Sequence, residues 1–182
     1  MPRYIAFLRA INVGGRHVVT MDRLRTLFEA LGFSAVETFI ASGNVVFESK
    51  ARDARALERK IERRLHEALG FEVATFLRTA EELAAIAAYE PFAPAALARA
   101  VALNVLFLRD ALDDRGKRAL MALRTELDDF HVDGREIHWL CRVTQGESTI
   151  SNVVLQKALG REATARGANT IRKMAAKFGR AP

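Results

Sequence analysis

Apolar positions along this chain recur with two different periods, and together they predict an alternation of strands and helices. Short apolar runs over residues 4–9, 35–41, 45–49 and 72–78 are typical of β-strands. Two other series repeat every three or four residues, which is the spacing of one helix face. They comprise Met21, Leu24, Leu27, Phe28 and Leu31 in the first and Leu57, Ile61, Leu65 and Leu69 in the second. The order β-α-β-β-α-β over the first 78 residues predicts a ferredoxin-like arrangement.

The second half of the chain repeats much of this pattern. A strand is expected over residues 102–109, a helix over 112–127, and two strands over 129–132 and 135–142 around an Asp133-Gly134 hairpin turn. Helices are expected near residues 150–159 and 165–178, so this half reads β-α-β-β-α-α. The chain is therefore predicted to be an α+β protein of two similar ferredoxin-like halves, with mostly antiparallel sheets and helices on one face.

The strongest break in the chain lies between these halves. Pro91 and Pro94 resist continuation of the helix expected before them. We therefore predict a ferredoxin-like half with its connecting helix over residues 1–91, and a related half ending in basic helices over residues 92–182. The tripeptide Phe7-Leu8-Arg9 at the end of the first strand returns as Phe107-Leu108-Arg109, which agrees with a duplication.

The predicted topology brings two polar loops of the first half together. In a β-α-β-β-α-β sheet the third strand is antiparallel to the first, so it begins where the first strand ends. Glycine backbone, arginine forks and amide side chains at such an edge are groups that bind anions. The candidate ligand-binding residues are Arg9, Asn12, Gly14, Gly15, Arg16, Ser42, Gly43 and Asn44. The alternative is a loop built for its turn, in which Asn12 and Asn44 tie backbone groups.

Charge adds a second region to this picture. The net charge is +6, and residues 1–156 are neutral, with 21 basic and 21 acidic residues. Residues 157–182 hold seven basic residues and one acidic residue, so the whole excess lies there. Such a block attracts phosphates or nucleic acid, and we expect Arg166, Arg172 and Lys173 to join the ligand site. The alternative is a solvated helix face.

The hairpin of the second half carries the remaining titratable groups. Around an Asp133-Gly134 turn, His131 would lie opposite Glu136, and Asp129 opposite His138, all on one face. Four such residues are able to hold a metal, but an antiparallel sheet with one polar face and charge pairs across its strands explains them as well. We expect no metal and no cofactor.

The cysteine content and the first residues of the chain indicate the cellular compartment. One cysteine, Cys141, excludes an internal disulfide and suits a reducing compartment. The first residues lack the apolar core of a signal peptide, and no apolar run reaches the roughly 18 residues that a membrane span needs. We therefore expect a cytoplasmic protein that does not enter membranes.

Three functional hypotheses follow from these residues. The first is binding of a nucleic acid or a nucleotide-like molecule at the Gly14-Gly15 loop and the Ser42-Gly43-Asn44 turn. The second is an enzyme acting on a phosphorylated or carboxylated small molecule at the same edge, with Asp129 or Glu136 approaching from the other half as general base. The third is an interaction module without catalysis, which would use a sheet edge or an apolar patch.

Three blocks of sequence carry a family resemblance. The opening block is residues 7–15, the second is Ser42-Gly43-Asn44-Val45-Val46-Phe47, and the closing block comprises residues 157–160, 164–166 and 169–173. Together they resemble the bacterial domain of unknown function family 1697. Here Gly167-Ala168 replaces the Asn-Trp usual in that family, and residues 145–148 match its Gly-Arg-Ser run only in part. The resemblance implies two related ferredoxin-like α+β halves and no activity.

Overall fold

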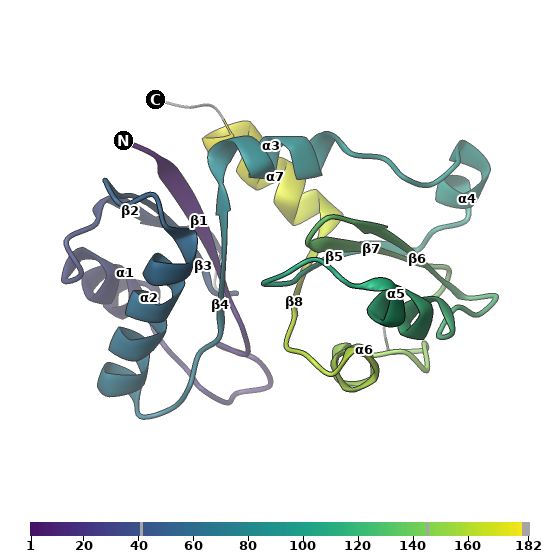
Figure 1. Ribbon diagram of the computed structural model, residues 1–182, viewed down its shortest axis with the longest axis horizontal. Helices are drawn as coiled ribbons and strands as arrows, with labels where there is room; N and C mark the ends of the chain where they lie inside the picture. Colours follow the sequence, from purple (N-terminus) through teal and green to yellow (C-terminus); the bar gives the residue numbers. More distant parts are fainter. Residues whose placement is uncertain (41, 145, 180–182) are drawn as a thin grey trace. The chain divides into compact units, whose positions relative to one another are not determined.

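The computed structural model describes residues 1–40, 42–144 and 146–179, and its contacts divide the chain into two compact units (Figure 1). The first unit comprises Met1–Ala87 together with the residues from Arg172 onward, and the second comprises Ala88–Ile171. Each unit holds one four-stranded antiparallel sheet. The predicted division into domains over residues 1–91 and 92–182 stays a prediction.

The first unit has the strand order β2-β3-β1-β4, every neighbouring pair being antiparallel. Its elements are β1 (Arg3–Leu8), α1 (Met21–Glu29), β2 (Ser34–Thr38), β3 (Asn44–Glu48), α2 (Ala54–Leu69), β4 (Thr75–Thr79) and α3 (Ala80–Ala88). This is the predicted β-α-β-β-α-β order. Thr20 and Asp53 cap α1 and α2, their side chains accepting from Arg23 N and Ala56 N.

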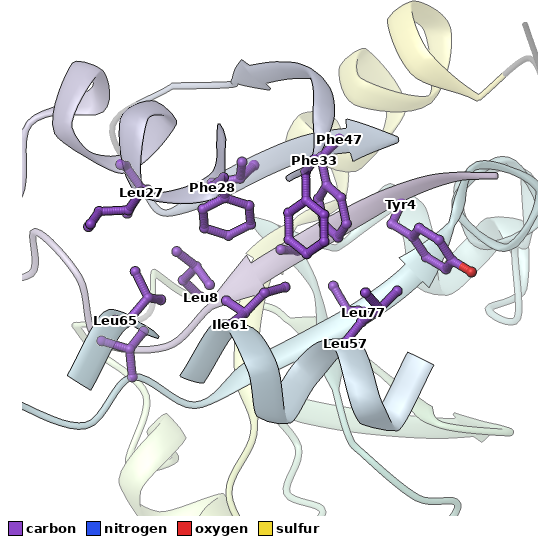
Figure 2. Close-up of a cluster of buried hydrophobic side chains, with 14 of the residues drawn as sticks. Tyr4, Leu8, Leu27, Phe28, Phe33, Phe47, Leu57, Ile61, Leu65 and Leu77 are labelled. Atoms are coloured by element: carbon purple, nitrogen blue, oxygen red, sulfur yellow. The ribbon is translucent and has the colours of Figure 1, made fainter. Parts of the chain in front are cut away.

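Helices α1 and α2 bury their apolar faces on one face of this sheet (Figure 2). Phe28 of α1 lies edge-on to Phe47 of β3, with ring centroids 5.6 Å apart. Phe33 stacks on the same Phe47 ring at 4.3 Å, and Ile61 of α2 is fully buried in this cluster. Burying each of these side chains stabilises the fold by about 1.5–3 kcal/mol, which sets the position of the strands and of the loops at their ends.

The outer edge of β4 is closed by carboxylates rather than left open. Three backbone N–H groups that point away from β1 each donate to a glutamate side chain. The bonds join Thr75 N to Glu62 Oε1 at 2.8 Å, Leu77 N to Glu58 Oε1 at 2.9 Å and Thr79 N to Glu82 Oε2 at 2.8 Å. Because these donors already have acceptors, β4 offers no free N–H row to an added strand.

The second unit has the strand order β6-β7-β5-β8, again antiparallel throughout. Its elements are α4 (Pro94–Ala98), β5 (Ala102–Phe107), α5 (Asp114–Met121), β6 (Asp128–Asp133), β7 (Glu136–Cys141), α6 (Asn152–Leu159), β8 (Thr164–Gly167) and α7 (Ala168–Phe178), of which α7 continues into the first unit. The α+β class with duplicated ferredoxin-like halves is thus confirmed.

Strand β8 of the second unit was not predicted, and neither was the short helix α4. Residues 165–167 were expected to begin the last helix, but they belong to strand β8, and the helix begins at Ala168. β8 pairs with β5, so that Arg166 lies opposite Val105. A four-residue edge strand of the composition Thr-Ala-Arg-Gly has no apolar alternation, and only its pairing partner makes it a strand. Both units therefore have four strands.

The β6–β7 hairpin has a different register from the one predicted. Asp133 pairs with Glu136, so the two turn residues are Gly134 and Arg135, with Gly134 at φ 55°. His131 consequently lies opposite His138 rather than Glu136, and Asp129 opposite Leu140 rather than His138. The turn sits one residue later because glycine takes the first central position, where φ is positive. The register moves by two residues, so the same side chains still share one face.

Equivalent residues of the two sheets can be identified from their registers. Ile5 of β1 pairs with Arg78 of β4, and Val105 of β5 pairs with Arg166 of β8. Where β1 and β5 end, Leu8 N donates to Gly43 O at 2.8 Å and Leu108 N donates to Arg135 O at 2.9 Å. The repeated Phe-Leu-Arg tripeptides therefore occupy the same place in both sheets.

Candidate functional site

The Gly14-Gly15 pair forms the tip of a small hairpin after β1. Arg16 N donates to Val13 O at 3.1 Å, and these two residues form an isolated antiparallel bridge. Gly14 has φ 59° and Gly15 has φ 71°, which is the pattern of a type I′ turn. Both glycines are exposed and a Cβ on either would meet nothing within 4 Å. Backbone conformation, not space, requires glycine here.

Asn12 holds the base of this hairpin. Its Oδ1 accepts from Val19 N at 2.8 Å and its Nδ2 donates to Val19 O at 3.0 Å. Its own backbone N donates to His17 O at 3.2 Å. The side chain thus pairs with one residue in the manner of a neighbouring strand, which closes the loop before α1 begins.

The second block lies where the topology predicts. A Cβ on Gly43 would come within 3.2 Å of Leu8 Cβ and 3.6 Å of Ile11 Cβ, so the turn packs directly on the end of β1. Asn44 is fully buried, and its Nδ2 donates to Phe39 O at 3.0 Å and Ser42 Oγ at 2.9 Å. The amides of Asn12 and Asn44 therefore hold backbone, whereas Ser42 remains exposed.

The two arginines of the loop differ in exposure. Arg9 is half-buried and its backbone N donates to Ala74 O at 2.9 Å. Arg16 is exposed beside the hairpin tip. Residues 9–20 contain no acidic side chain, and Glu72 is the acidic residue of the turn before β4. Within residues 9–20, Arg9 and Arg16 are therefore the charged side chains that set the local field, which is positive.

An aromatic pair completes this edge. The His17 ring stacks on the Phe71 ring, with centroids 4.0 Å apart and planes 12° apart. His17 is exposed and Phe71, which follows the Gly70 cap of α2, is half-buried. Sequence reasoning found no partner for His17. The signal was topological, because β4 begins where β1 ends and brings the α2–β4 turn to the same edge. We call residues 9–19, 42–44 and Phe71 the loop edge.

Backbone strain gathers in this part of the first unit. Five non-glycine residues of the described chain have positive φ, and four belong to the loop edge or the turn leading into it. These are Ala10 at 58°, Asn12 at 56°, His17 at 52° and Ile40 at 49°. Asparagine and histidine tolerate this region, but a β-branched isoleucine is a genuine outlier. Such strain costs about 1–3 kcal/mol per residue and is typical of functional loops.

The C-terminal basic residues have different environments. Arg166 is only 8% exposed on β8, where its Nη1 donates to Thr164 Oγ1 and Ala165 O, both at 2.9 Å. Burial lowers the pKa of Arg166 to about 10. Arg172 and Lys173 are exposed on α7. Arg166 therefore forms hydrogen bonds within its own strand, whereas Arg172 and Lys173 lie on the exposed surface of α7. That these three residues join the ligand site stays a prediction.

The polar face of the second sheet holds a buried histidine. His138 is 6% exposed, and its Nε2 has no hydrogen-bond partner among the described residues. Burial, with a smaller effect of His131, lowers the pKa of His138 to about 4, against an opposing effect of Asp133. Tyr89 Oη lies 2.9 Å from His131 Nε2. Within the described ranges, no group of three His, Cys, Asp or Glu side chains is placed to hold a metal.

Cys141 lies on the opposite, apolar face of β7. It is fully buried, and burial together with Asp128 raises the pKa of its thiol to about 12. The thiol is therefore protonated at neutral pH, which does not suit a nucleophile. The neighbouring Asp128 accepts from Trp139 Nε1 at 2.9 Å and from Ser148 Oγ.

The length and apolar character of the helices show whether any of them is able to cross a membrane. Across the described part of the chain, no helix is both long and apolar enough to span a membrane.

Comparison with known proteins shows where this architecture occurs. The structure of the conserved bacterial protein SP0830 from Streptococcus pneumoniae is similar, with a TM-score of 0.77 and 26% sequence identity. The match covers 98% of this chain and 99% of that protein. No protein with a curated description matches the chain. The family described as "Protein of unknown function (DUF1697)" matches residues 1–138, which include both the Gly14-Gly15 loop and the Ser42-Gly43-Asn44 turn, and the chain therefore belongs to that family.

Proposed function

We propose that the loop edge of the first unit binds a phosphate-bearing ligand with a planar base, a single-stranded nucleic acid or a nucleotide. The observation that carries this proposal is the exposed Arg16 next to the exposed His17 on one strained hairpin. An arginine supplies a fork of donors for phosphate oxygens. An exposed ring supplies a surface on which a base can stack.

The charge of the loop supports the phosphate part of this proposal. Arg9 and Arg16 lie on a segment without acidic residues, so a phosphate meets no local repulsion from residues 9–20. Contacts of this kind release counterions from a nucleic acid, and affinity falls as salt rises. Asn12 contributes by holding the base of the hairpin that presents Arg16.

The aromatic pair supports the base part. Phe71 covers one side of the His17 ring at 4.0 Å, and His17 remains exposed to solvent. A base that stacks on the uncovered side would extend the pair to three layers. Stacking of a base on an aromatic side chain contributes about 1–3 kcal/mol and tolerates every base. Binding is therefore expected to depend little on sequence.

A fluorescently labelled single-stranded oligonucleotide tests this function by anisotropy at several salt concentrations. Arg16→Ala should lower affinity about tenfold at low salt and reduce the salt slope by about 1, because one phosphate contact is lost. His17→Ala should lower affinity with an unchanged slope, because stacking releases no counterions.

The matched control is Arg63→Ala, which removes an exposed arginine from α2 rather than from the loop edge. It should leave both affinity and slope nearly unchanged. Equal losses for Arg16→Ala and Arg63→Ala, or no salt-sensitive binding of any oligonucleotide or nucleotide, would show that the loop edge is not the site.

A further inference from the structure

We propose that a hollow between α5 and α6 of the second unit binds a small phosphomonoester, independently of the loop edge. The hollow has a volume of about 440 Å³. Its walls carry three basic side chains, Arg115 from α5, Lys157 from α6 and Arg161 from the turn before β8. A volume of this size lies within the range of small-molecule sites.

The charge of this hollow is the first reason for an anionic ligand. Arg115 and Lys157 are exposed, and neither takes part in an ion pair within the described residues. Arg161 Nη1 donates to Ala111 O at 3.4 Å, which leaves most of its guanidinium donors for a ligand. Three cations without carboxylate partners favour a doubly charged group over a monovalent anion.

The single acidic residue of the wall narrows the ligand class. One oxygen of Asp113 accepts from Gly116 N at 2.7 Å and caps α5. The second oxygen would repel a bare phosphate but accepts a hydroxyl group. A phosphate ester that carries a hydroxyl satisfies both the basic side chains and Asp113. The glycine and alanines that share the walls, Gly116, Ala119 and Ala158, leave room for such a group.

Duplication explains why the hollow is open. The segment from the end of the first strand to the helix cap covers residues 9–19 in the first unit but only residues 108–112 in the second. The residue after the left-handed glycine cap is Phe71 in the first unit, where it stacks on His17. After the corresponding Gly160 cap it is Arg161, and no long loop covers it. A second hollow, lined by Arg109 and Glu162 among others, adjoins the first and shares Arg161 with it.

Glycerol phosphate titrated into the ¹⁵N-labelled full chain tests the proposal, with amide shifts followed by NMR. Saturable shifts are expected at the amides of Gly116 and Gly160. Lys157→Ala should raise the dissociation constant about fivefold, which is the size expected for the loss of one solvent-exposed charge contact. Lys157 is exposed, so this change should not disturb folding.

Lys117→Ala is the matched control, because Lys117 is an exposed lysine of α5 that does not line the hollow. It should leave the dissociation constant unchanged. Shifts that do not saturate, or equal weakening by Lys117→Ala, would overturn the site. Equal affinity for sulfate would overturn the assignment of a phosphomonoester. None of these results depends on oligonucleotide binding at the loop edge.

Discussion

The two units share one sheet order, yet they differ most at the corner that follows the first strand. In the first unit this corner is an eleven-residue hairpin loop, residues 9–19, with positive-φ residues at Ala10, Asn12 and His17. In the second unit a short segment leads directly into α5, and a basic hollow lies beside it. The scaffold is constant and the corner varies, which is how folds acquire different binding sites.

A second contrast lies inside the sheets. Val46 of β3 lies opposite Ile5 of β1, and the equivalent residue of β7, which lies opposite Val105 of β5, is His138. Both side chains are buried. An apolar residue at this place is insensitive to pH, whereas a buried histidine must gain a proton in acid. The second unit should therefore be the acid-sensitive one.

We expect the largest effect from His138→Val, which places the valine of the first unit at this position and should change how stability depends on pH. The pKa of His138 is lowered to about 4 by burial, below its usual 6.5, so the folded state holds the neutral ring. Stability from this group is present above pH 6.5 and is lost as pH falls through 4, by about 3 kcal/mol. Urea unfolding at pH 7 and pH 4 should show the wild type losing that much more stability than the variant. Identical pH profiles would refute the contrast.

Gly43→Ala should have the next largest effect, about 2 kcal/mol of destabilisation of the first unit. Gly43 has φ +77°, and a Cβ would lie 3.2 Å from Leu8 Cβ. Left-handed backbone and crowding both oppose a side chain. Arg135 holds the equivalent place in the second unit without positive φ, so Arg135→Ala should cost less than about 1 kcal/mol. Urea unfolding midpoints of the two variants measure both changes in stability. A larger destabilisation by Arg135→Ala than by Gly43→Ala would show that the two corners are not equivalent.

Asn12→Ala should have the smallest effect, about 1 kcal/mol, because two hydrogen bonds to Val19 are lost at a half-buried site. Faster hydrogen exchange should be confined to residues 10–19, since the sheet does not depend on this loop. Asn152→Ala, at an exposed position of α6, serves as the matched control and should change nothing measurable. Faster exchange spreading into β1 would mean that the hairpin supports the sheet instead of resting on it.

Most of the fold followed from local pattern. Apolar residues that recur every three or four positions marked the helices of the first unit, and the strand order followed from pairing rules. β8 was missed because four mixed residues carry no period, and the hairpin register was wrong because turn position depends on backbone φ at Gly134. Both features depend on how a strand pairs with its neighbour, β8 with β5 and β6 with β7.

The candidate site divides in the same way. Sequence identified the loop and its partner turn, because the topology of a β-α-β-β-α-β sheet joins them. It did not reveal that His17 stacks on Phe71, since these residues are distant in the chain and meet only at the strand ends. It also did not separate exposed Arg16 from buried Arg166, because both are arginines in polar surroundings.

Sequence by itself therefore determined the order of strands and helices in the first unit, the duplication and the location of the Gly14-Gly15 loop, because these depend on local periodicity and turn chemistry. Tertiary structure alone decided which polar groups remain exposed to solvent. Asn12 and Asn44 bind backbone and Arg166 is enclosed in its sheet, while Arg16 and His17 stay exposed. Solvent exposure and hydrogen-bond partners depend on residues far apart in the chain, which no local pattern encodes.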